Sequence, residues 1–148
     1  MTFRVEMYRG SYQDGSLEEY MLDVWTWRTL LDFAKKNGWS AQGTKPDPEQ
    51  TSNPEYMKHF TSDYEPKDMA LTKYFDGEDA RQLAEALTNG LNRVHQGDIQ
   101  APKKSGTTFI SDSMNREEVE RMNRYYLDLI PEFAEYLQRG DFSFAWDD

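Results

Sequence analysis

The sequence predicts an α+β domain in which a small antiparallel sheet, made of an N-terminal hairpin and a C-terminal strand, packs against three main helices. Both ends of the chain alternate apolar and polar residues, which is the period of a strand with one buried face. Three internal segments instead carry apolar residues at helical spacing. Because neither terminal strand can bury its apolar face alone, we expect both in one sheet whose aromatic face the helices cover.

The composition indicates one folded and strongly charged domain. The 148 residues fit a single domain over residues 1–148, which is long enough to bury a core. The chain has 4 Trp, 9 Tyr and 8 Phe, so we expect an aromatic core. Clusters of Pro, Gly, Ser and Thr predict long loops at residues 40–75 and 97–113.

Charge and residue types exclude several classes of function. There are no cysteines, which rules out disulfides, thiolate catalysis and cysteine-ligated zinc. The formal charge of -10 opposes binding to nucleic acid and to anionic membranes. The start of the chain lacks a leader pattern, and no apolar run is long enough to cross a bilayer. We therefore expect a soluble cytoplasmic protein with a basic protein as its candidate partner, and the sequence leaves homo-oligomerisation open.

The N-terminal hairpin follows from alternation and a turn signal. Phe3, Val5 and Met7 alternate with polar-phase residues, and Asp14-Gly15 is a pair suited to a tight turn. Residues 17–21 can then return antiparallel to the first strand.

The helix that follows is the element around which we expect the domain to pack. Asp23 is placed to cap it, and Leu22 and Trp27 have the spacing of a hydrophobic staple. The helix should end at Gly38, and we expect Trp39 to fill the core. Its apolar stripe consists of Val24, Trp27, Leu30, Leu31 and Ala34.

Trp25 lies off this stripe, since successive helical residues differ by about 100°. Either another element covers its side chain or it is exposed for contact with a ligand. We favour cover by the N-terminal hairpin, because tryptophan is highly buried on average.

Between the first and second helices the pattern is weaker. Asn53-Pro54 predicts a short helix over residues 55–60, and a strand and a helical turn remain alternatives between residues 67 and 74. Asp76 should cap the second helix, whose stripe continues to His95 unless Gly90 ends it early.

The last helix should begin at a capping box formed by Asn115 and Glu118. Its apolar stripe stays in phase across Pro131, which favours one bent helix or two nearly collinear helices. Gly140 can end it, and the alternation of Phe142, Phe144 and Trp146 predicts the C-terminal strand, all within residues 115–146.

Part of the chain resembles a known sequence pattern. The matching residues are Trp27, Leu30, Leu31, Ala34, Gly38, Trp39, Gly43 and Thr44, followed by Asp79, Ala80, Leu83, Ala84, Ala86 and Leu87. This pattern is similar to that of small acidic bacterial proteins of uncharacterised function, and the chain departs from it at residues 45–74 and 97–113. Because the matching residues are mostly core and cap types, the resemblance implies a shared fold and a bacterial origin and transfers no catalytic residue.

Motifs for catalysis and metal binding are weak. The stretch 103–108 has the residue types of a phosphate-binding loop in the wrong order. His59 with Asp63, and His95 with Asp98, have helical ligand spacing, but two ligands do not complete a zinc site. We therefore predict no catalytic residue, no metal ligand and no cofactor.

Two functions of different classes remain. The first is a non-catalytic acidic interaction domain, of which an immunity or inhibitor protein against a basic toxin is the most specific form. Its candidate binding residues are Trp25 and Tyr125, which lie off the apolar stripes, and the acids Glu117, Glu120 and Asp128. The alternative is a small hydrolase or metal-dependent enzyme that uses His59 or His95 with nearby carboxylates.

Overall fold

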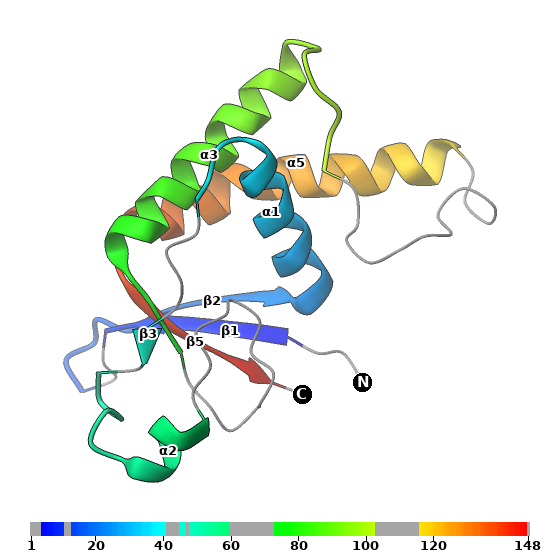
Figure 1. Cartoon of the computed structure of the whole chain (residues 1–148). Coiled ribbons are helices and arrows are strands. Elements are labelled where there is room, and N and C mark those ends of the chain that lie inside the picture. The colour runs from blue at the N-terminus through cyan, green and yellow to red at the C-terminus, as the bar shows by residue number, and fades with distance from the viewer. Residues whose placement is uncertain are drawn as a thin grey trace.

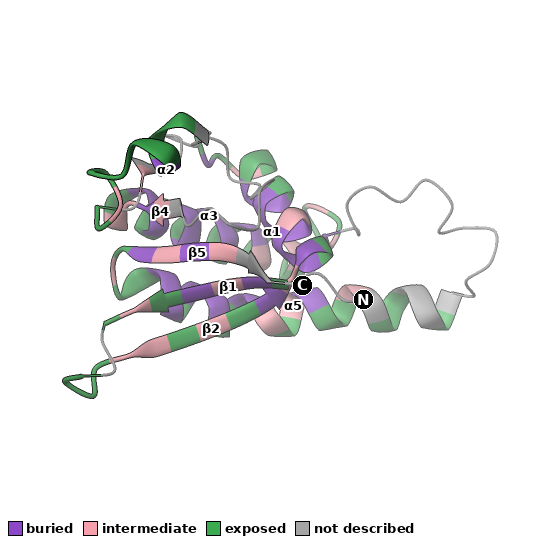
Figure 2. Ribbon diagram, turned by 90° about the horizontal axis from the view of Figure 1, so that it is seen from below, coloured by how far each residue is buried: buried purple, intermediate pink, exposed green. Residues whose placement is uncertain are grey.

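Three long helices pack on one face of an antiparallel sheet (Figure 1). The computed structural model describes residues 4–10, 13–40, 45–46, 48–59, 73–102 and 116–147. The helices are α1 (Val24–Lys36), α3 (Gly77–His95) and α5 (Arg116–Gln138). Figure 2 views the sheet from its other side, with all three helices behind it. The α+β class predicted from the sequence is confirmed.

The sheet joins the two ends of the chain. Its strands are β1 (Arg4–Arg9), β2 (Glu18–Asp23), β3 (Lys45–Pro46), β4 (Lys73–Phe75) and β5 (Phe142–Asp147). Their order is β2-β1-β5-β4-β3, and every neighbouring pair is antiparallel. The C-terminal strand β5 therefore lies at the centre of the sheet and pairs with β1, so the prediction that both ends of the chain share one antiparallel sheet is confirmed.

Each strand has one face toward the helices and one face away from them. Val5 and Met7 of β1 are buried, and Met7 lies opposite Phe144 of β5, which is also buried. On the other face, Tyr8 and Met21 have exposed fractions of 37% and 45%. The pleat thus separates an aromatic core from a polar outer face, as Figure 2 shows by the alternation of its burial colours.

The described part of residues 40–75, which we expected to form a long connection, contains three short elements. Tyr74 of β4 pairs with Lys45 of β3, and Phe75 is fully buried. Of the segment 67–74, for which a strand and a helical turn were alternatives, Lys73 and Tyr74 belong to a strand, and residues 67–72 lie outside the described residues. The predicted short helix is α2 (Pro54–His59), whose Glu55 amide donates to Asn53 Oδ1 at 3.1 Å.

Helix α1 begins directly after the predicted cap Asp23 and ends two residues before Gly38. The Asp23 carboxylate accepts from the Thr26 amide at 2.8 Å and from the Thr26 hydroxyl at 2.7 Å. Leu22 and Trp27, the predicted staple pair, are both buried. The helix ends at Lys36, and Gly38 has a φ of +99°, a conformation that favours glycine.

Helix α3 runs through Gly90 to His95, so the glycine does not end it. Asp76 caps its first turn by accepting from the Glu78 amide at 3.0 Å. A Cβ atom added at Gly90 would lie 2.5 Å from Cε2 of Phe33 in α1. The absence of a side chain therefore allows α1 and α3 to approach closely at this position.

Helix α5 is continuous across Pro131. Of the two arrangements that the in-phase stripe allowed, the structure has the single helix. The predicted capping residue Asn115 lies outside the described residues, as does the side chain of Glu118. After the helix, Gly140 has a φ of +126° and leads directly into β5.

Aromatic rings from both layers meet at Trp27, which is fully buried. Its ring centroid lies 6.3 Å from Phe75, 6.3 Å from Phe133 and 5.3 Å from Phe144. Trp39 is also buried, and its indole N–H donates to Asp79 Oδ1 at 2.8 Å. The prediction that Trp39 fills the core is therefore confirmed.

Candidate interaction surface

Trp25 lies in the first turn of α1, and 43% of its side chain is exposed. The expectation that the N-terminal hairpin covers it is wrong. The hairpin pairs with β5 in the sheet, and Phe144 of β5 packs on Trp27, which lies on the buried stripe of α1. The Arg28 guanidinium lies 5.4 Å from the centroid of the Trp25 ring, which is cation–π geometry.

Tyr125 is the most exposed large apolar side chain described in α5, with an exposed fraction of 50%. Its ring packs edge-on against Tyr126 at 5.6 Å between centroids. Tyr126 itself is buried, and burial raises its pKa while a hydrogen bond with Thr29 of α1 acts in the opposite direction. Tyr126 thus joins α5 to α1, and the exposed Tyr125 is its neighbour in the chain.

The two predicted aromatic residues are exposed on two helices that a hydrogen bond connects. Trp25 precedes Thr29 by one turn of α1, and Tyr125 adjoins Tyr126 on α5. The hydrogen bond between Thr29 and Tyr126 joins the two helices near these positions.

The predicted acids Glu117, Glu120 and Asp128 are all exposed on α5. Glu117 and Glu120 belong to the first turns of the helix, which extend beyond the sheet in both ribbon views (Figures 1 and 2). Arg121 and Arg124 are exposed between them and Asp128. The face is therefore acidic in balance but mixed in charge. We refer to Trp25, Glu117, Glu120, Tyr125 and Asp128 as the α1–α5 surface.

The C-terminal half of α5 packs against β2. Tyr20 of β2 stacks on Phe133 and Tyr136 of α5, with centroid distances of 5.7 and 5.3 Å. Burial raises the pKa of Tyr20, and the nearby charge of Glu132 raises it further. Glu132 and Glu135 are exposed, so acids border β2 along α5.

Two exposed side chains on the outer face of the sheet were not among the predicted binding residues. Tyr8 lies directly opposite Glu19, and Met21 lies directly opposite Glu6. These four residues border a hollow of about 300 Å³ between β1 and β2. The sequence could have indicated the exposure of Tyr8, because Tyr8 lies on the polar side of the alternating pattern in the first strand.

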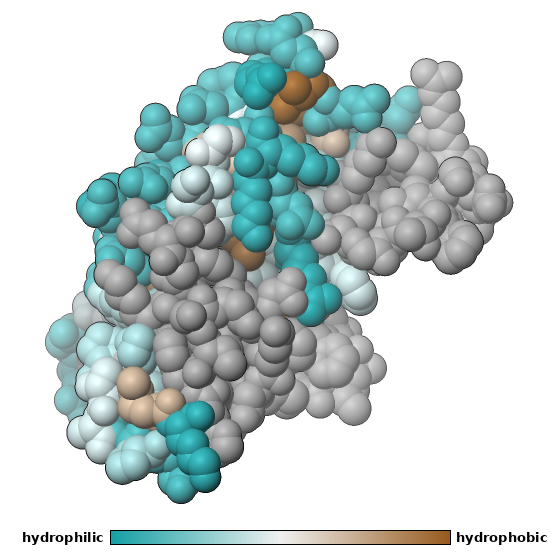
Figure 3. Space-filling view, viewed as in Figure 1, coloured by the Kyte–Doolittle hydropathy of each residue, from teal (hydrophilic) through white to brown (hydrophobic). Residues whose placement is uncertain are grey.

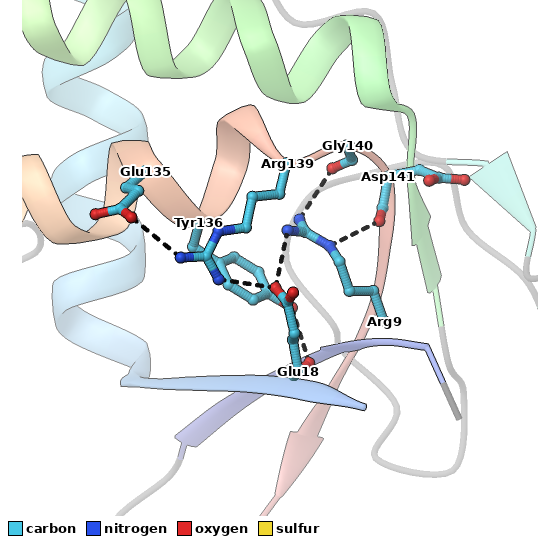
Figure 4. Close-up of polar contacts among 7 residues, drawn as sticks. All are labelled: Arg9, Glu18, Glu135, Tyr136, Arg139, Gly140 and Asp141. Carbon is cyan, nitrogen blue, oxygen red and sulfur yellow. Dashed lines mark hydrogen bonds and ion pairs between the residues drawn. The ribbon is translucent and has the colours of Figure 1, made fainter. Parts of the chain in front are cut away.

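A cluster of charged residues joins the hairpin to the end of α5 (Figure 4). Arg9 donates to the carbonyls of Gly140 at 3.0 Å and Asp141 at 3.2 Å. Its guanidinium carbon lies 4.1 Å from the centroid of the Tyr136 ring. A cation at this position also interacts favourably with the C-terminal end of the helix dipole.

The second arginine of this cluster completes the link to β2. Arg139 donates to Glu18 Oε2 at 2.9 Å and to Glu135 Oε1 at 3.1 Å. Because these side chains connect β2, α5 and the turn before β5, we assign the cluster a structural role.

The alternative catalytic residues do not converge in the part of the chain that the structure describes. His95 is exposed at the end of α3, and Asp98 is exposed just after it. The side chain of His59, Asp63 and the stretch 103–108 lie outside the described residues. Among the described residues, no group of three or more His, Asp or Glu side chains could hold a metal ion.

The face that carries α1 and α3 shows mainly hydrophilic side chains and isolated apolar ones among its described residues (Figure 3). None of the helices in the described segments has the length and apolar character required to span a membrane.

No protein-family model matches this chain, and neither the curated proteins nor the solved structures searched contain a match. The pattern seen in the sequence can still be placed in the fold. Of its residues, Trp39 and Asp79 form the buried hydrogen bond between the end of α1 and the start of α3. The pattern residues of the two helices are otherwise buried. They therefore support packing and carry no indication of a reaction.

Proposed function

We propose that this chain is a non-catalytic, acidic interaction domain that binds a basic protein. The observation that carries the proposal is the exposure of Trp25 on α1 and of Tyr125 on α5, a helix whose exposed side chains are acidic in balance. Exposed aromatic residues supply most of the affinity in many protein interfaces, whereas charges of one sign accelerate encounter with a partner of opposite sign.

The charges of the α1–α5 surface support a basic partner in particular. Among the α5 side chains described, Glu117, Glu120, Asp128, Glu132 and Glu135 are exposed against the two exposed arginines Arg121 and Arg124. The whole chain carries a formal charge of -10, so its long-range field has the same sign as this local balance.

The most specific form of the proposal is an immunity or inhibitor protein that neutralises a basic bacterial toxin. It combines the acidic surface with the bacterial origin that the sequence pattern implies. In this form, coexpression of the chain should relieve the growth defect caused by its partner.

The proposal is tested by capturing a partner on the immobilised protein from an extract of the source cells and measuring its binding kinetics. Reversing the three acids of the α1–α5 surface (Glu117→Lys, Glu120→Lys and Asp128→Lys) should slow association, and added salt should reproduce the effect with the wild-type chain. Trp25→Ala and Tyr125→Ala should instead speed dissociation about tenfold or more, as expected for interface anchors.

A matched control reverses three exposed acids elsewhere, at Glu55, Glu85 and Asp98. This control changes the net charge equally and should slow association less. Circular dichroism verifies that each variant is folded. A partner whose association rate is insensitive to salt and to the α5 reversals would contradict the proposal.

A further inference from the structure

We propose that the basic partner docks by adding an extended, lysine- or arginine-rich segment to the outer edge of β2. This inference rests on the proposed function, since it takes the partner to be basic. It adds the conformation of the docking segment and its place on the sheet.

The two edges of the described sheet differ in their ability to accept another strand. β3 has two residues, and Pro46 lacks the amide donor that a hydrogen-bonded ladder requires. β2 has six residues without proline or glycine. An edge strand directs the N–H and C=O groups of alternate residues away from the sheet. β2 is therefore the edge on which a further strand can pair over several residues (Figure 2).

Side chains on the outer face of the sheet favour a basic segment at this edge. Glu19 is exposed and lies opposite Tyr8, and Met21 is exposed beside it on the same face. A lysine or arginine in an added strand can place its charge near Glu19 and its aliphatic stem along Met21. Cross-strand pairs of opposite charge stabilise a sheet, whereas a carboxylate opposite Glu19 would be repelled.

Side chains on the helix-facing side of the sheet also favour a basic segment. Tyr20 of β2 packs on α5, and Glu132, an exposed acid of that helix, lies close enough to act on Tyr20, whereas Glu135 is bonded to Arg139. An added strand therefore lies near Glu132 as well as near Glu19 on the outer face.

A second copy of this chain is a less favourable occupant of the edge. Two β2 strands that pair edge to edge keep their outer faces on the same side, so pairing centred on Met21 would place Glu19 of each copy opposite Asp23 of the other. Like charges in opposed positions destabilise such pairs. The acids thus protect the edge against self-association and leave it able to accept a strand of opposite charge.

The test uses a short peptide of alternating lysine with valine or threonine, blocked at both ends, and NMR hydrogen exchange on the full chain. Binding should protect alternate amides within Glu18–Asp23. Glu19→Lys should weaken binding about tenfold, because one attraction becomes a repulsion. Met21→Lys should act in the same direction. Glu85→Lys, an equal charge change at an exposed site on α3, should alter affinity less than about twofold.

A peptide of the same charge with prolines at alternate positions separates strand pairing from simple charge attraction, because it cannot form the ladder and should not bind. Equal binding of the proline peptide, equal effects of Glu19→Lys and Glu85→Lys, or no protection within β2 would each overturn the inference. So would a peptide-free dimer in sedimentation with β2 amides already protected, since a second copy would then occupy the edge.

The test also separates this inference from the proposed function. If the lysine peptide fails while a captured basic protein still depends on the α5 acids, strand docking alone is refuted. If the captured protein is also insensitive to those acids, the proposed function fails as well.

Discussion

At the scale of single residues, the position of a tryptophan relative to the apolar stripe determines whether its side chain is buried in the core or exposed on the surface. Trp27 and Trp39 are buried, whereas Trp25 is exposed only two residues from Trp27. The sequence predicted the first two from the apolar stripe and the cap. It did not predict the exposure of Trp25, because the position of the hairpin relative to α1 depends on pairing with the distant strand β5.

Tyr136 provides a residue-scale prediction about alkaline stability. Burial raises the pKa of Tyr136 to about 12, with opposing contributions from Arg9 and Glu18. In the unfolded chain a tyrosine ionises near pH 10, so the folded state retains this proton between about pH 10 and 12. The resulting stabilisation is complete below pH 10 and is lost as the pH rises through 12.

Tyr136→Phe should therefore make the decline in unfolding free energy between pH 10 and 12 shallower than in the wild type. At pH 7 the change should be within about 1 kcal/mol, because the hydroxyl makes one long hydrogen bond to the Glu18 carbonyl at 3.5 Å. Denaturant titrations at a series of pH values measure both quantities, and Tyr125→Phe at an exposed site is the control. An unchanged slope for Tyr136→Phe would contradict the argument.

At the scale of elements, local signals predicted the long helices well and the short strands poorly. Asp23 and Asp76 cap α1 and α3 as expected, because a cap involves only neighbouring residues. β3 was not predicted, and for β4 a strand was only one of two alternatives, since Lys45 pairs with Tyr74 far along the chain and each strand has no more than three residues. For such short segments the pairing partner, rather than the local pattern, decides the structure.

The crossing of α1 and α3 at Gly90 gives an element-scale prediction. Alanine favours a helix over glycine by about 1 kcal/mol, so Gly90→Ala on an isolated helix would stabilise it. Here the added Cβ would lie 2.5 Å from Cε2 and 2.8 Å from Cζ of the buried Phe33 ring. Such overpacking costs about 1 to 3 kcal/mol, so the net effect should be destabilising.

Denaturant unfolding of Gly90→Ala should therefore show a lower midpoint than the wild type. Asn89→Ala, at the exposed neighbouring position, is the control for helix propensity and should leave the midpoint unchanged or raise it. A higher midpoint for Gly90→Ala would show that the two helices can separate at little cost.

At the scale of the whole molecule, charge and surface shape were predictable to different degrees. The exposure of Glu117, Glu120, Tyr125 and Asp128 follows from helical phase and is confirmed. The surface formed by Tyr8 and Met21 was not predicted, because it arises only when β1 and β2 pair in one particular register. What the sequence does supply directly is the charge of -10, which acts on the entire fold.

This charge predicts opposite effects of salt on folding and on binding. The mutual repulsion of the acids destabilises the compact state, so raising NaCl toward 0.15 M, where the Debye length is about 8 Å, should raise the midpoint of thermal unfolding. The same screening should slow association with a basic partner. Reversing Glu117, Glu120 and Asp128 to lysine lowers the magnitude of the net charge from -10 and should weaken both salt effects together.

If salt instead lowered the unfolding midpoint of the wild-type chain, ion pairs such as Arg139 with Glu18 would outweigh the repulsion. Charged side chains would then stabilise the fold through local ion pairs. In that case, attraction of a basic partner would depend on the acids of the α1–α5 surface alone.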